Sequence, residues 1–470
     1  MRKTKIVATL GPASDSPETI LKLLTNGVNV FRFNTKHADP VWHRERIERV
    51  RAIGREYNLP VSIFVDLQGP EIRIETLNKE PVLVAKDEEF VFALDFLKNV
   101  KSVKVPIKEV FEALKVGDVV MLNDGYQEFT VIHVQSDQMT VRALDDYEIG
   151  HRKGMNLPGI DVALSSLAAR DFDFLTMVEE LDGVEYIGLS FVRRKTDVDI
   201  LRKELIKRKI NTHIISKIEG AHAIEAIDEI IEVSDAIMVA RGDLGVELPI
   251  EQLTYLQKMI IRKCRLAAKP VITATEMLES MHDHPRPTRA EVSDVANAVY
   301  DGTDAVMLSG ETANGQFPVQ AVAMMARIAN YNEEKNGILH LELDLGLDQS
   351  KAITHAVMDL VRLHKDFEID AVVVFTQTGR TARELARFHP HTPVIAISED
   401  IQVCNQLALV YGVQAFRFDF PVGEIIEIES VAKLLCAEAV ISPGQRVVFV
   451  HGNRWRVPGL TNTISIKEIV

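Results

Sequence analysis

Two neighbouring segments decide the fold: Thr212–Gly220, THIISKIEG, and Asp235–Asp243, DAIMVARGD. Each is a short run of apolar, strand-forming residues that ends in charged side chains, and a helical stretch separates the two. Apolar runs that alternate with amphipathic helical stretches indicate parallel strands joined by crossover helices. Counting outward, three runs of this kind precede residue 70 and five follow residue 160, so the sequence predicts eight strand-helix units.

Eight such units over roughly 250 residues predict a (β/α)8 TIM barrel, in which the active site lies at the C-terminal ends of the strands. The predicted strand ends share a polar character. They carry Arg32, Asn34, Asp66, Lys217, Glu219, Arg241, Asp243, Thr275, Glu276, Ser309 and Glu311. A doubly wound open sheet is the structural alternative, but it does not so readily gather residues from this many strands in one place.

The barrel rhythm is interrupted once and ends before the chain does. Residues 71–159 contain short strand-forming runs separated by turn residues, which predicts a small β-barrel domain acting as a lid over the barrel mouth. Residues 339–470 return to alternating strands and helices and predict a C-terminal α/β domain. The barrel itself is predicted over 1–70 and 160–338.

The composition of the 470-residue chain is that of a globular protein, with 46% hydrophobic residues and a formal net charge of −14. This charge argues against general binding to nucleic acid or to acidic membranes. The three cysteines, Cys264, Cys404 and Cys436, show no CxxC spacing and fit a reducing compartment. No run of 18 uncharged apolar residues occurs, so we expect a cytoplasmic protein without a membrane span.

The charged ends of the two opening segments suit phosphoryl chemistry. Lys217 and Glu219 are two positions apart on one strand and so face the same side, and Asp243 ends the adjacent strand. Two carboxylates from adjacent strands suit Mg²⁺, which shares its oxygen ligands with substrate and water. A lysine between them suits a charged phosphoryl group in its transition state. A salt-bridge network that only closes the barrel is the alternative.

Several longer motifs carry a family resemblance over essentially the whole chain. They are KIVATLGP (5–12), DLQGPEIR (66–73), NLPG (156–159), IMVARGDLGVELP (237–249), MLESM with PRPTRAEVSDVANAVYDGTDAVMLSGET (277–312) and the terminal TNT (461–463). In this order they resemble pyruvate kinase. The resemblance implies the glycolytic transfer of a phosphoryl group from phosphoenolpyruvate to ADP, with Mg²⁺ or Mn²⁺ and usually K⁺, in a homotetramer.

The resemblance also implies roles for matching residues. Lys217 would be the transition-state lysine, Glu219 and Asp243 would bind the divalent ion, and Arg32 and Arg73 would contact the moving phosphoryl group. Phosphoenolpyruvate would further contact the backbone of residues 240–243, that is Ala240, Arg241, Gly242 and Asp243, together with Thr275. The nucleotide would be bound by Arg32, His37, Arg73 and Lys153, and Thr275 and Ser309 would serve protonation of the enolate.

The monovalent-cation site departs from the family pattern. Asn34, Asp66 and the carbonyl of Leu67 match its K⁺ ligands, but Lys36 replaces the usual serine. A lysine ammonium carries one positive charge, which leads to the hypothesis that this enzyme works without K⁺. Two observations compete with it: Lys36 could extend into solvent, and Glu71 is the residue of K⁺-dependent relatives.

The C-terminal domain resembles the family's regulatory domain. TQTGRT (376–381) places hydroxyl groups and a glycine between a strand and a helix, which suits phosphate. The predicted effector site comprises Thr376, Thr378, Gly379, Arg380, Thr381, Trp455 and Arg456, for a sugar phosphate or a nucleotide. The rival functions are a catalytically silent metabolite sensor and another barrel enzyme acting on phosphoenolpyruvate or pyruvate.

Overall fold

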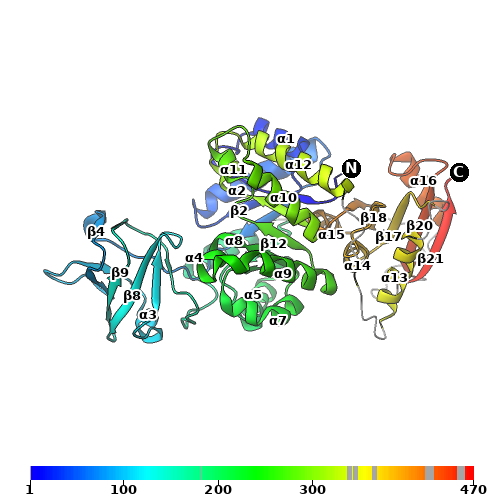
Figure 1. Cartoon of the computed structure of the whole chain (residues 1–470). Helices are drawn as coiled ribbons and strands as arrows, with labels where there is room; N and C mark the ends of the chain where they lie inside the picture. Colours follow the sequence, from blue (N-terminus) through cyan, green and yellow to red (C-terminus); the bar gives the residue numbers. More distant parts are fainter. Residues whose placement is uncertain are drawn as a thin grey trace.

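The computed structural model describes residues 2–181, 183–335, 341, 348–362, 368–418, 428–452 and 461–470. Three bodies lie in a row, with the inserted β domain at one end, the barrel in the middle and the C-terminal domain at the other end (Figure 1). The predicted boundary at residues 338 and 339 lies outside the described residues.

Eight parallel strands form a closed barrel in the order β1-β16-β15-β14-β13-β12-β3-β2. They are β1 (Lys5–Thr9), β2 (Val30–Asn34), β3 (Ser62–Asp66), β12 (Tyr186–Leu189), β13 (His213–Ile218), β14 (Ala236–Ala240), β15 (Val271–Ala274) and β16 (Ala305–Leu308). Each of these strands lies within one of the eight predicted apolar runs. The TIM-barrel prediction is therefore confirmed, and the open doubly wound sheet is excluded.

A helix follows each barrel strand and packs on its outside. The main helices are α1 (Pro17–Thr25), α2 (Pro40–Glu56), α4 (Ala169–Glu179), α5 (Lys195–Arg208), α7 (Ile227–Val233), α9 (Leu253–Ala267), α10 (Arg289–Asp301) and α12 (Pro318–Lys335), with short helices α6 (Ala221–Glu225), α8 (Arg241–Glu247) and α11 (Gly310–Ala313) at strand ends. Capping residues in the sequence mark where these helices begin. Asp39 caps α2 just before Pro40, and Thr288 with Glu291 forms a capping box on α10.

The barrel strands are apolar on both faces because one face lines the barrel interior and the other packs against the helices. In β1, Ile6 and Ala8 belong to the outer core while Val7 belongs to the inner one. Leu409 of the C-terminal domain joins the inner cluster. It closes the end of the barrel at which the strands begin, here called the lower end; the upper end is the one at which the strands finish. Polar side chains are left for the C-terminal strand ends, where the site lies.

The insert forms a six-stranded sheet in the order β11-β7-β8-β9-β5-β6 and a two-stranded sheet of β10 and β4. Its elements are β4 (Val82–Val84), β5 (Glu89–Ala93), β6 (Ser102–Lys104), α3 (Lys108–Ala113), β7 (Val119–Leu122), β8 (Gln127–Val134), β9 (Gln138–Ala143), β10 (Tyr147–Ile149) and β11 (Met155–Asn156). The prediction of a small β domain is confirmed with one correction. The sheet is a curled half-barrel rather than a closed barrel, since its edge strands β11 and β6 do not pair with each other.

The C-terminal domain contains one mixed sheet in the order β19-β18-β17-β20-β21, in which β21 is antiparallel to its neighbour. Its elements are α13 (Gln349–Arg362), β17 (Ala371–Phe375), α14 (Arg380–Ala386), β18 (Val394–Ser398), α15 (Ile401–Gln406), β19 (Val413–Arg417), α16 (Ile428–Ala437), β20 (Arg446–Gly452) and β21 (Thr461–Glu468). The predicted α/β class is confirmed. The final strand β21 was not predicted, because TNTISIKE has only two apolar residues, Ile464 and Ile466, and lies at the edge of the sheet.

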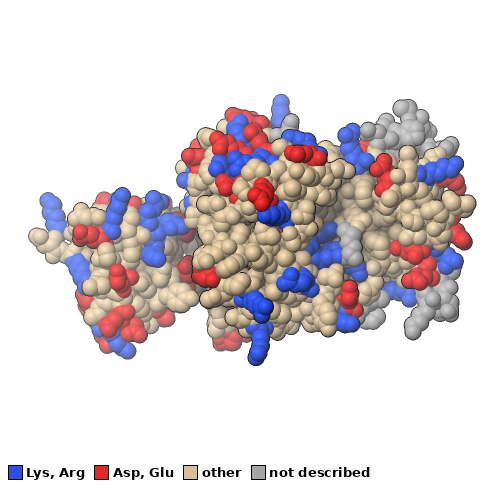
Figure 2. All heavy atoms as spheres, turned by 90° about the horizontal axis from the view of Figure 1, so that it is seen from above, with Lys and Arg blue, Asp and Glu red and all other residues tan. Residues whose placement is uncertain are grey.

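Buried polar groups join the lower end of the barrel to the C-terminal domain. Lys5 donates to the carbonyl of Val413 at 2.7 Å, and Asp304 accepts from the backbone N–H of Tyr411 at 3.0 Å. The surface charges are mixed, and Lys, Arg, Asp and Glu side chains are interspersed on the face shown in Figure 2. Among the described residues, the helices are too short or too polar to span a lipid bilayer.

Candidate active site

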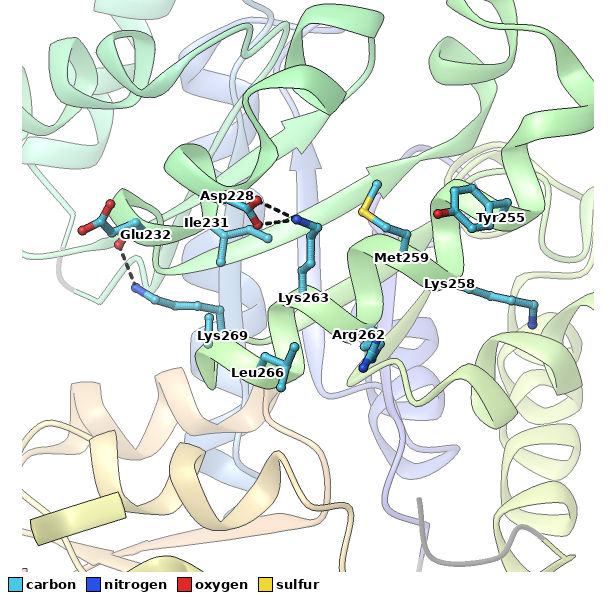
Figure 3. Close-up of a pocket in the computed structure, with 11 residues that line it drawn as sticks. Asp228, Ile231, Glu232, Tyr255, Lys258, Met259, Arg262, Lys263, Leu266 and Lys269 are labelled. Atoms are coloured by element: carbon cyan, nitrogen blue, oxygen red, sulfur yellow. Dashed lines mark hydrogen bonds and ion pairs between the residues drawn. The ribbon is translucent and has the colours of Figure 1, made fainter. Parts of the chain in front are cut away.

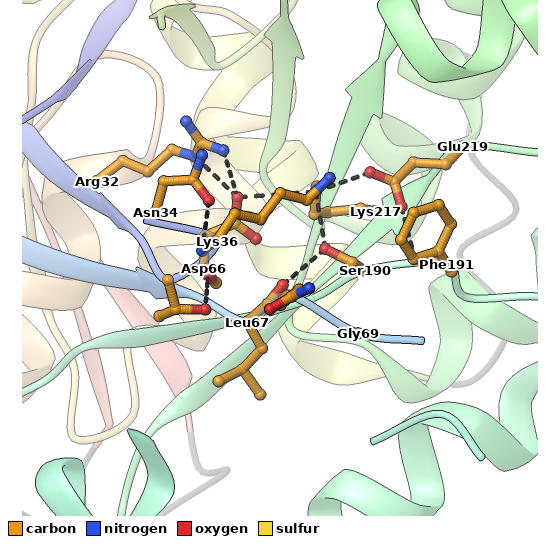
Figure 4. A network of polar contacts seen from close by, with 12 residues as sticks. Arg32, Asn34, Lys36, Asp66, Leu67, Gly69, Ser190, Phe191, Lys217 and Glu219 are labelled. Carbon is orange, nitrogen blue, oxygen red and sulfur yellow. Dashed lines mark hydrogen bonds and ion pairs between the residues drawn. The ribbon is translucent and has the colours of Figure 1, made fainter. Parts of the chain in front are cut away.

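Lys217 is the centre of the polar network at the C-terminal end of the barrel (Figure 4). Its ammonium group donates a hydrogen bond to Oγ of Ser190 at 2.8 Å and lies 2.7 Å from Oε1 of Glu219. Oδ2 of Asp66 is 3.7 Å away. Strands β3, β12 and β13 are neighbours in the barrel, so these groups meet although they are far apart in sequence.

Asp66 also holds Arg32, which comes from β2 on its other side. The guanidinium group of Arg32 contacts Oδ2 of Asp66 at 2.8 Å through Nε and at 2.6 Å through Nη2. Its Nη1 donates to Oγ1 of Thr9 at 3.0 Å. One buried carboxylate thus orients two cations, Arg32 and Lys217, toward the same end of the barrel.

The charges shift each other's pKa values. Burial alone would lower the pKa of Lys217, but the carboxylates of Asp66, Glu219 and Asp243 outweigh burial and raise it. Burial pushes the pKa of Asp66 upward, but Lys217 and Arg32 outweigh burial and hold it below its usual value. The lysine is therefore an ammonium ion at neutral pH, and it can stabilise negative charge on a ligand.

Two buried carboxylate oxygens here accept no hydrogen bond, namely Oδ1 of Asp66 and Oε1 of Glu219. The second lies close to Lys217 but outside hydrogen-bond geometry. Burial raises the pKa of Glu219, and the charge of Asp243 adds to this effect. A cation would give Oδ1 of Asp66 a partner, and it would add to the positive charge that Lys217 already places beside Glu219. Glu219 and Asp243 line one cavity, so they fit a divalent ion that completes its coordination with substrate oxygens and water.

The described residues contain no group of three or more His, Cys, Asp or Glu side chains placed to hold a metal by themselves. This agrees with a site that offers two carboxylates. An ion held in this way depends on the substrate for its remaining ligands.

The end of β15 is a strained turn. Thr275 and Glu276 both have positive φ, at 66° and 54°, in the region that β-branched residues avoid. The turn is held by Arg241, whose Nη2 donates to the carbonyl of Thr275 at 2.6 Å while Nη1 pairs with Asp294 at 2.7 Å. The buried side chain of Arg241 therefore supports the site, and strain of this kind is typical of functional sites.

Oγ1 of Thr275 accepts a hydrogen bond from the backbone N–H of Gly242 at 2.8 Å and donates to the carbonyl of Ala274 at 2.6 Å. The structure thus brings the predicted carboxylate-binding residues of strands β14 and β15 together. Ser309 lies at the end of β16, where its backbone N–H donates to Glu311 at 2.7 Å.

Lys36 points into the cavity between the barrel and the insert, which has a volume of about 170 Å³ and is also lined by Glu71, Phe191, Glu219 and Asp243. Its Nζ lies 3.7 Å from Oε1 of Glu71 and 5.5 Å from the ring centre of Phe191. Its charge adds to the lowering of the Asp66 pKa by Lys217 and Arg32, and it opposes the rise that burial causes in the pKa of Glu219. The alternative in which Lys36 extends into solvent is therefore not the arrangement seen here.

The predicted K⁺ ligands have other partners in the part of the chain that the structure describes. Oδ1 of Asn34 accepts from the backbone N–H of Lys36 at 3.2 Å, and the carbonyl of Leu67 accepts from Ser190 at 2.8 Å. The ammonium of Lys36 thus acts on this site through its field, beside the oxygens rather than among them.

Two predicted nucleotide residues, Arg73 and Lys153, lie near the hinge of the insert, where the chain crosses between the barrel and the β domain. Arg73 contacts Oε2 of Glu71 at 3.0 Å and donates to the carbonyl of Arg152, next to Lys153. Burial lowers the pKa of His37, and the charges of Lys36, Arg32 and Arg73 lower it further. Glu71 thus links Lys36 of the barrel to Arg73 of the insert.

This arrangement can be compared with known proteins. Residues 1–322 match the family model described as pyruvate kinase, barrel domain, and residues 351–467 match the one described as pyruvate kinase, alpha/beta domain. The chain belongs to the pyruvate kinase family. Its activity is that of a pyruvate kinase, an enzyme of glycolysis.

The relatives support the family over the whole chain. The pyruvate kinase of Clostridium acetobutylicum is 37% identical over 476 residues, which cover 100% of both proteins. That of Staphylococcus epidermidis is 39% identical and covers 100% of this chain and 81% of its own length. The crystal structure of a pyruvate kinase from Cryptosporidium parvum superposes with a TM-score of 0.91 at 31% identity, covering 100% of this chain and 96% of that one.

Two members of the network were missed from the sequence. Ser190 follows β12 and bridges Lys217 to Leu67, and Thr9 ends β1 and holds Arg32. Both are single hydroxyl residues at strand ends, in the runs EYIGLSFV and KIVATLG. The strand ends considered from the sequence were those of six strands, and including the ends of the first and fourth strands would have found them.

The predicted effector residues are only partly described. Arg380 pairs with Asp348 at 2.6 Å and with Glu384 at 2.8 Å, and Oγ1 of Thr381 lies 3.0 Å from Oγ1 of Thr461. Gly379 has a φ of 73°, which favours glycine at the start of α14. Trp455 and Arg456 lie outside the described residues, and the site stays a prediction.

A larger cavity of about 950 Å³ lies outside the barrel, between α7 and α9 (Figure 3). Its lysines are engaged: Lys263 pairs with Asp228 at 2.6 Å, and Lys269 donates to the carbonyls of Ser234 and Glu232. It is separate from the strand ends that carry the site, so its size does not make it the active site.

Proposed function

We propose that this chain transfers the phosphoryl group of phosphoenolpyruvate to ADP at the mouth of its barrel, giving pyruvate and ATP. The observation that carries the proposal is the ammonium of Lys217, held by Ser190 and Glu219 beside the cavity that Asp243 lines. A buried, rigid cation stabilises charge that develops on a transferred phosphoryl group and on the enolate it leaves.

The remaining predicted residues divide the work around Lys217. Arg32, fixed by Asp66 and Thr9, contacts the phosphoryl group from the opposite side, and Arg73 reaches it from the hinge. Thr275 and the backbone of residues 240–243 hold the carboxylate of phosphoenolpyruvate. His37 and Lys153 lie toward the nucleotide, and Thr275 with Ser309 serves protonation of the enolate.

Glu219 and Asp243 would hold Mg²⁺ or Mn²⁺. Such an ion supplies positive charge that neutralises the phosphoryl oxygens and the enolate. The shared cavity supports this proposal, because Glu219 and Asp243 both line it and offer carboxylate oxygens from adjacent strands.

We also propose that turnover does not require K⁺. Lys36 places a permanent positive charge in the cavity that contains Glu219 and Asp243, and this charge lowers the pKa of Asp66, a predicted K⁺ ligand. A monovalent cation contributes mainly its charge, so a fixed ammonium can replace that part of its effect.

The test is a coupled assay of pyruvate formation with Mg²⁺ in tetramethylammonium buffer, with and without added KCl. We expect the wild type to turn over in both and to change less than about threefold with KCl. Lys36→Ser restores the serine expected at this position and should become dependent on KCl, whereas Lys36→Arg keeps the charge and should not.

Each outcome separates the two proposals. No pyruvate from the wild type under any salt would overturn the phosphoryl-transfer proposal and favour a metabolite sensor. Activity that rises tenfold or more with KCl in the wild type would overturn only the proposal for Lys36.

Three further points remain proposals that follow from family membership. The chain forms a homotetramer, its domains are 1–70 with 160–338, 71–159 and 339–470, and the C-terminal domain binds a sugar phosphate or nucleotide effector. The strand-helix turn at TQTGRT supports an effector site, and isothermal titration with candidate sugar phosphates and nucleotides tests it.

A further inference from the structure

Ser190 lies at the end of a barrel strand and outside the family motifs. It follows β12, which pairs with β3 on one side and β13 on the other. Its side chain is fully buried, and its Oγ lies 2.8 Å from both Nζ of Lys217 and the carbonyl oxygen of Leu67. One hydroxyl group therefore joins the end of β3 to the lysine on β13 (Figure 4).

The chemistry of the three groups fixes the direction of these hydrogen bonds. An ammonium group can only donate, and a carbonyl oxygen can only accept. The hydroxyl of Ser190 must therefore accept from Lys217 and donate its own proton to Leu67. The proton of this hydroxyl points to the carbonyl oxygen of Leu67. A change of the Ser190 side-chain rotamer would break the hydrogen bonds to both Lys217 and Leu67.

The backbone around Ser190 is held as firmly as its side chain. Gly69 has a φ of 68°, and a side chain there would come within 3.1 Å of Cβ and 3.2 Å of the carbonyl oxygen of Ser190. The loop after β3 thus packs directly on Ser190. A buried hydroxyl on a fixed backbone makes a rigid anchor for a flexible lysine.

Lys217 needs such an anchor because its other partners are carboxylates on both sides. Glu219 lies at 2.7 Å and Asp66 at 3.7 Å, and Ser190 is the hydroxyl partner that sets its position between them. A long side chain attracted by two charges has no single preferred place unless a directional bond selects one.

We infer that Ser190 is a positioning residue for phosphoryl transfer: its hydroxyl holds the Lys217 ammonium in line and ties it to the Leu67 carbonyl. This inference rests on the proposed function, because it assumes that Lys217 meets the phosphoryl group. Since the hydroxyl acts on the lysine and does not reach the substrate, its loss lowers kcat and leaves KM for phosphoenolpyruvate nearly unchanged.

The test compares Ser190→Ala, Ser190→Cys and Ser190→Thr with the wild type in the coupled assay. We expect kcat to fall about 10- to 100-fold in the Ala and Cys variants, with KM for phosphoenolpyruvate within threefold, because each loses a strong hydrogen bond to a charged group. Cys is the matched control for shape, since its thiol fills the same space but bonds weakly. Thr keeps the hydroxyl and should recover most of kcat.

Thermal unfolding of each variant completes the test. A wild-type kcat in both Ser190→Ala and Ser190→Cys would overturn the inference. Equal loss in the Cys and Thr variants, in step with lowered unfolding temperatures, would also overturn it and assign Ser190 to packing. An inactive wild type would instead overturn the proposed function, so the two failures are distinguishable.

Discussion

The two ends of the barrel bury carboxylates in different ways. At the lower end, both oxygens of Asp304 accept backbone N–H groups, from Val271 and Tyr411, each at 3.0 Å. Both oxygens of Glu185 are likewise bonded. At the upper end, Oδ1 of Asp66 is buried and accepts no hydrogen bond, and Oε1 of Glu219 meets the Lys217 ammonium at 2.7 Å.

This difference separates carboxylates that stabilise the fold from carboxylates that are available to a ligand. A buried charge whose bonds are complete contributes to the packing of two domains, whereas a buried charge left incomplete costs stability until a ligand or cation arrives. Residues at the upper ends of barrel strands are expected to act on substrate, and those at the lower ends to stabilise the fold. The contrast can be tested by changing equivalent groups at both ends.

The largest effect is expected from Lys217→Met, compared with Lys5→Met. Both lysines are buried in barrel strands, one at each end. Loss of the Lys217 charge should lower kcat by about 10³-fold, because a fixed cation at developing charge is worth this much. Steady-state kinetics with phosphoenolpyruvate and ADP measure the change.

Lys5→Met is the matched control for that experiment. It removes the hydrogen bond to Val413 and the cation near Asp304, so it should cost about 1–3 kcal/mol of stability. The kcat per folded enzyme should stay within about twofold. Equal losses of kcat in the two variants would break the contrast between the ends.

A smaller effect is expected from Glu219→Gln at the upper end. The amide keeps the shape but removes the charge that a divalent ion needs, and we expect Mn²⁺ to bind about 100-fold more weakly. Titration of Mn²⁺ followed by electron paramagnetic resonance measures this. Glu247→Gln, which lines the same cavity but is not a proposed ligand, should leave Mn²⁺ affinity nearly unchanged.

A further effect is expected from pH at the lower end. Burial raises the pKa of Asp304 to about 6. The folded protein therefore keeps a proton that the unfolded chain loses above about pH 4, so stability falls by up to about 3 kcal/mol as pH rises from about 4 to 6. Burial lowers the pKa of Lys5 to about 8, and its own contribution changes only above that pH.

Denaturant unfolding of the wild type and Asp304→Asn between pH 5 and pH 8 checks this. The variant should lose the change between pH 5 and pH 6.5, while kcat per folded enzyme stays near that of the wild type. A pH dependence that persists unchanged in the variant would show that other groups cause it.

Much of the fold could be predicted because each barrel strand is a short apolar run between helices with their own capping signals, as at Asp39 and Thr288. The insert was less predictable. Its β class was predicted, but closure of a sheet depends on pairing between edges that the order of strands along the chain does not specify. The edge strand β21 was missed for another reason, since only two of its residues, Ile464 and Ile466, are apolar.

At the site, the sequence predicted which charged residues gather, but not the contacts they make. The side chain of Arg241 turned out to hold the strained turn at Thr275. Lys36 pairs with Glu71. Glu71 is the residue of K⁺-dependent relatives, and here it is the partner of the lysine on which the hypothesis of K⁺ independence rests. Such pairings depend on side-chain directions across neighbouring elements, which motif matching does not give.

The sequence by itself determined the eight-stranded barrel, its family and the charged strand ends, because these follow from periodicity and local motifs. Only the tertiary structure decided that Ser190 links Lys217 to Leu67, that Oδ1 of Asp66 stays unpartnered, and that the lower end is closed by the C-terminal domain. Hydrogen bonds of this kind join residues more than 20 positions apart, and their geometry is set by the packing of whole strands.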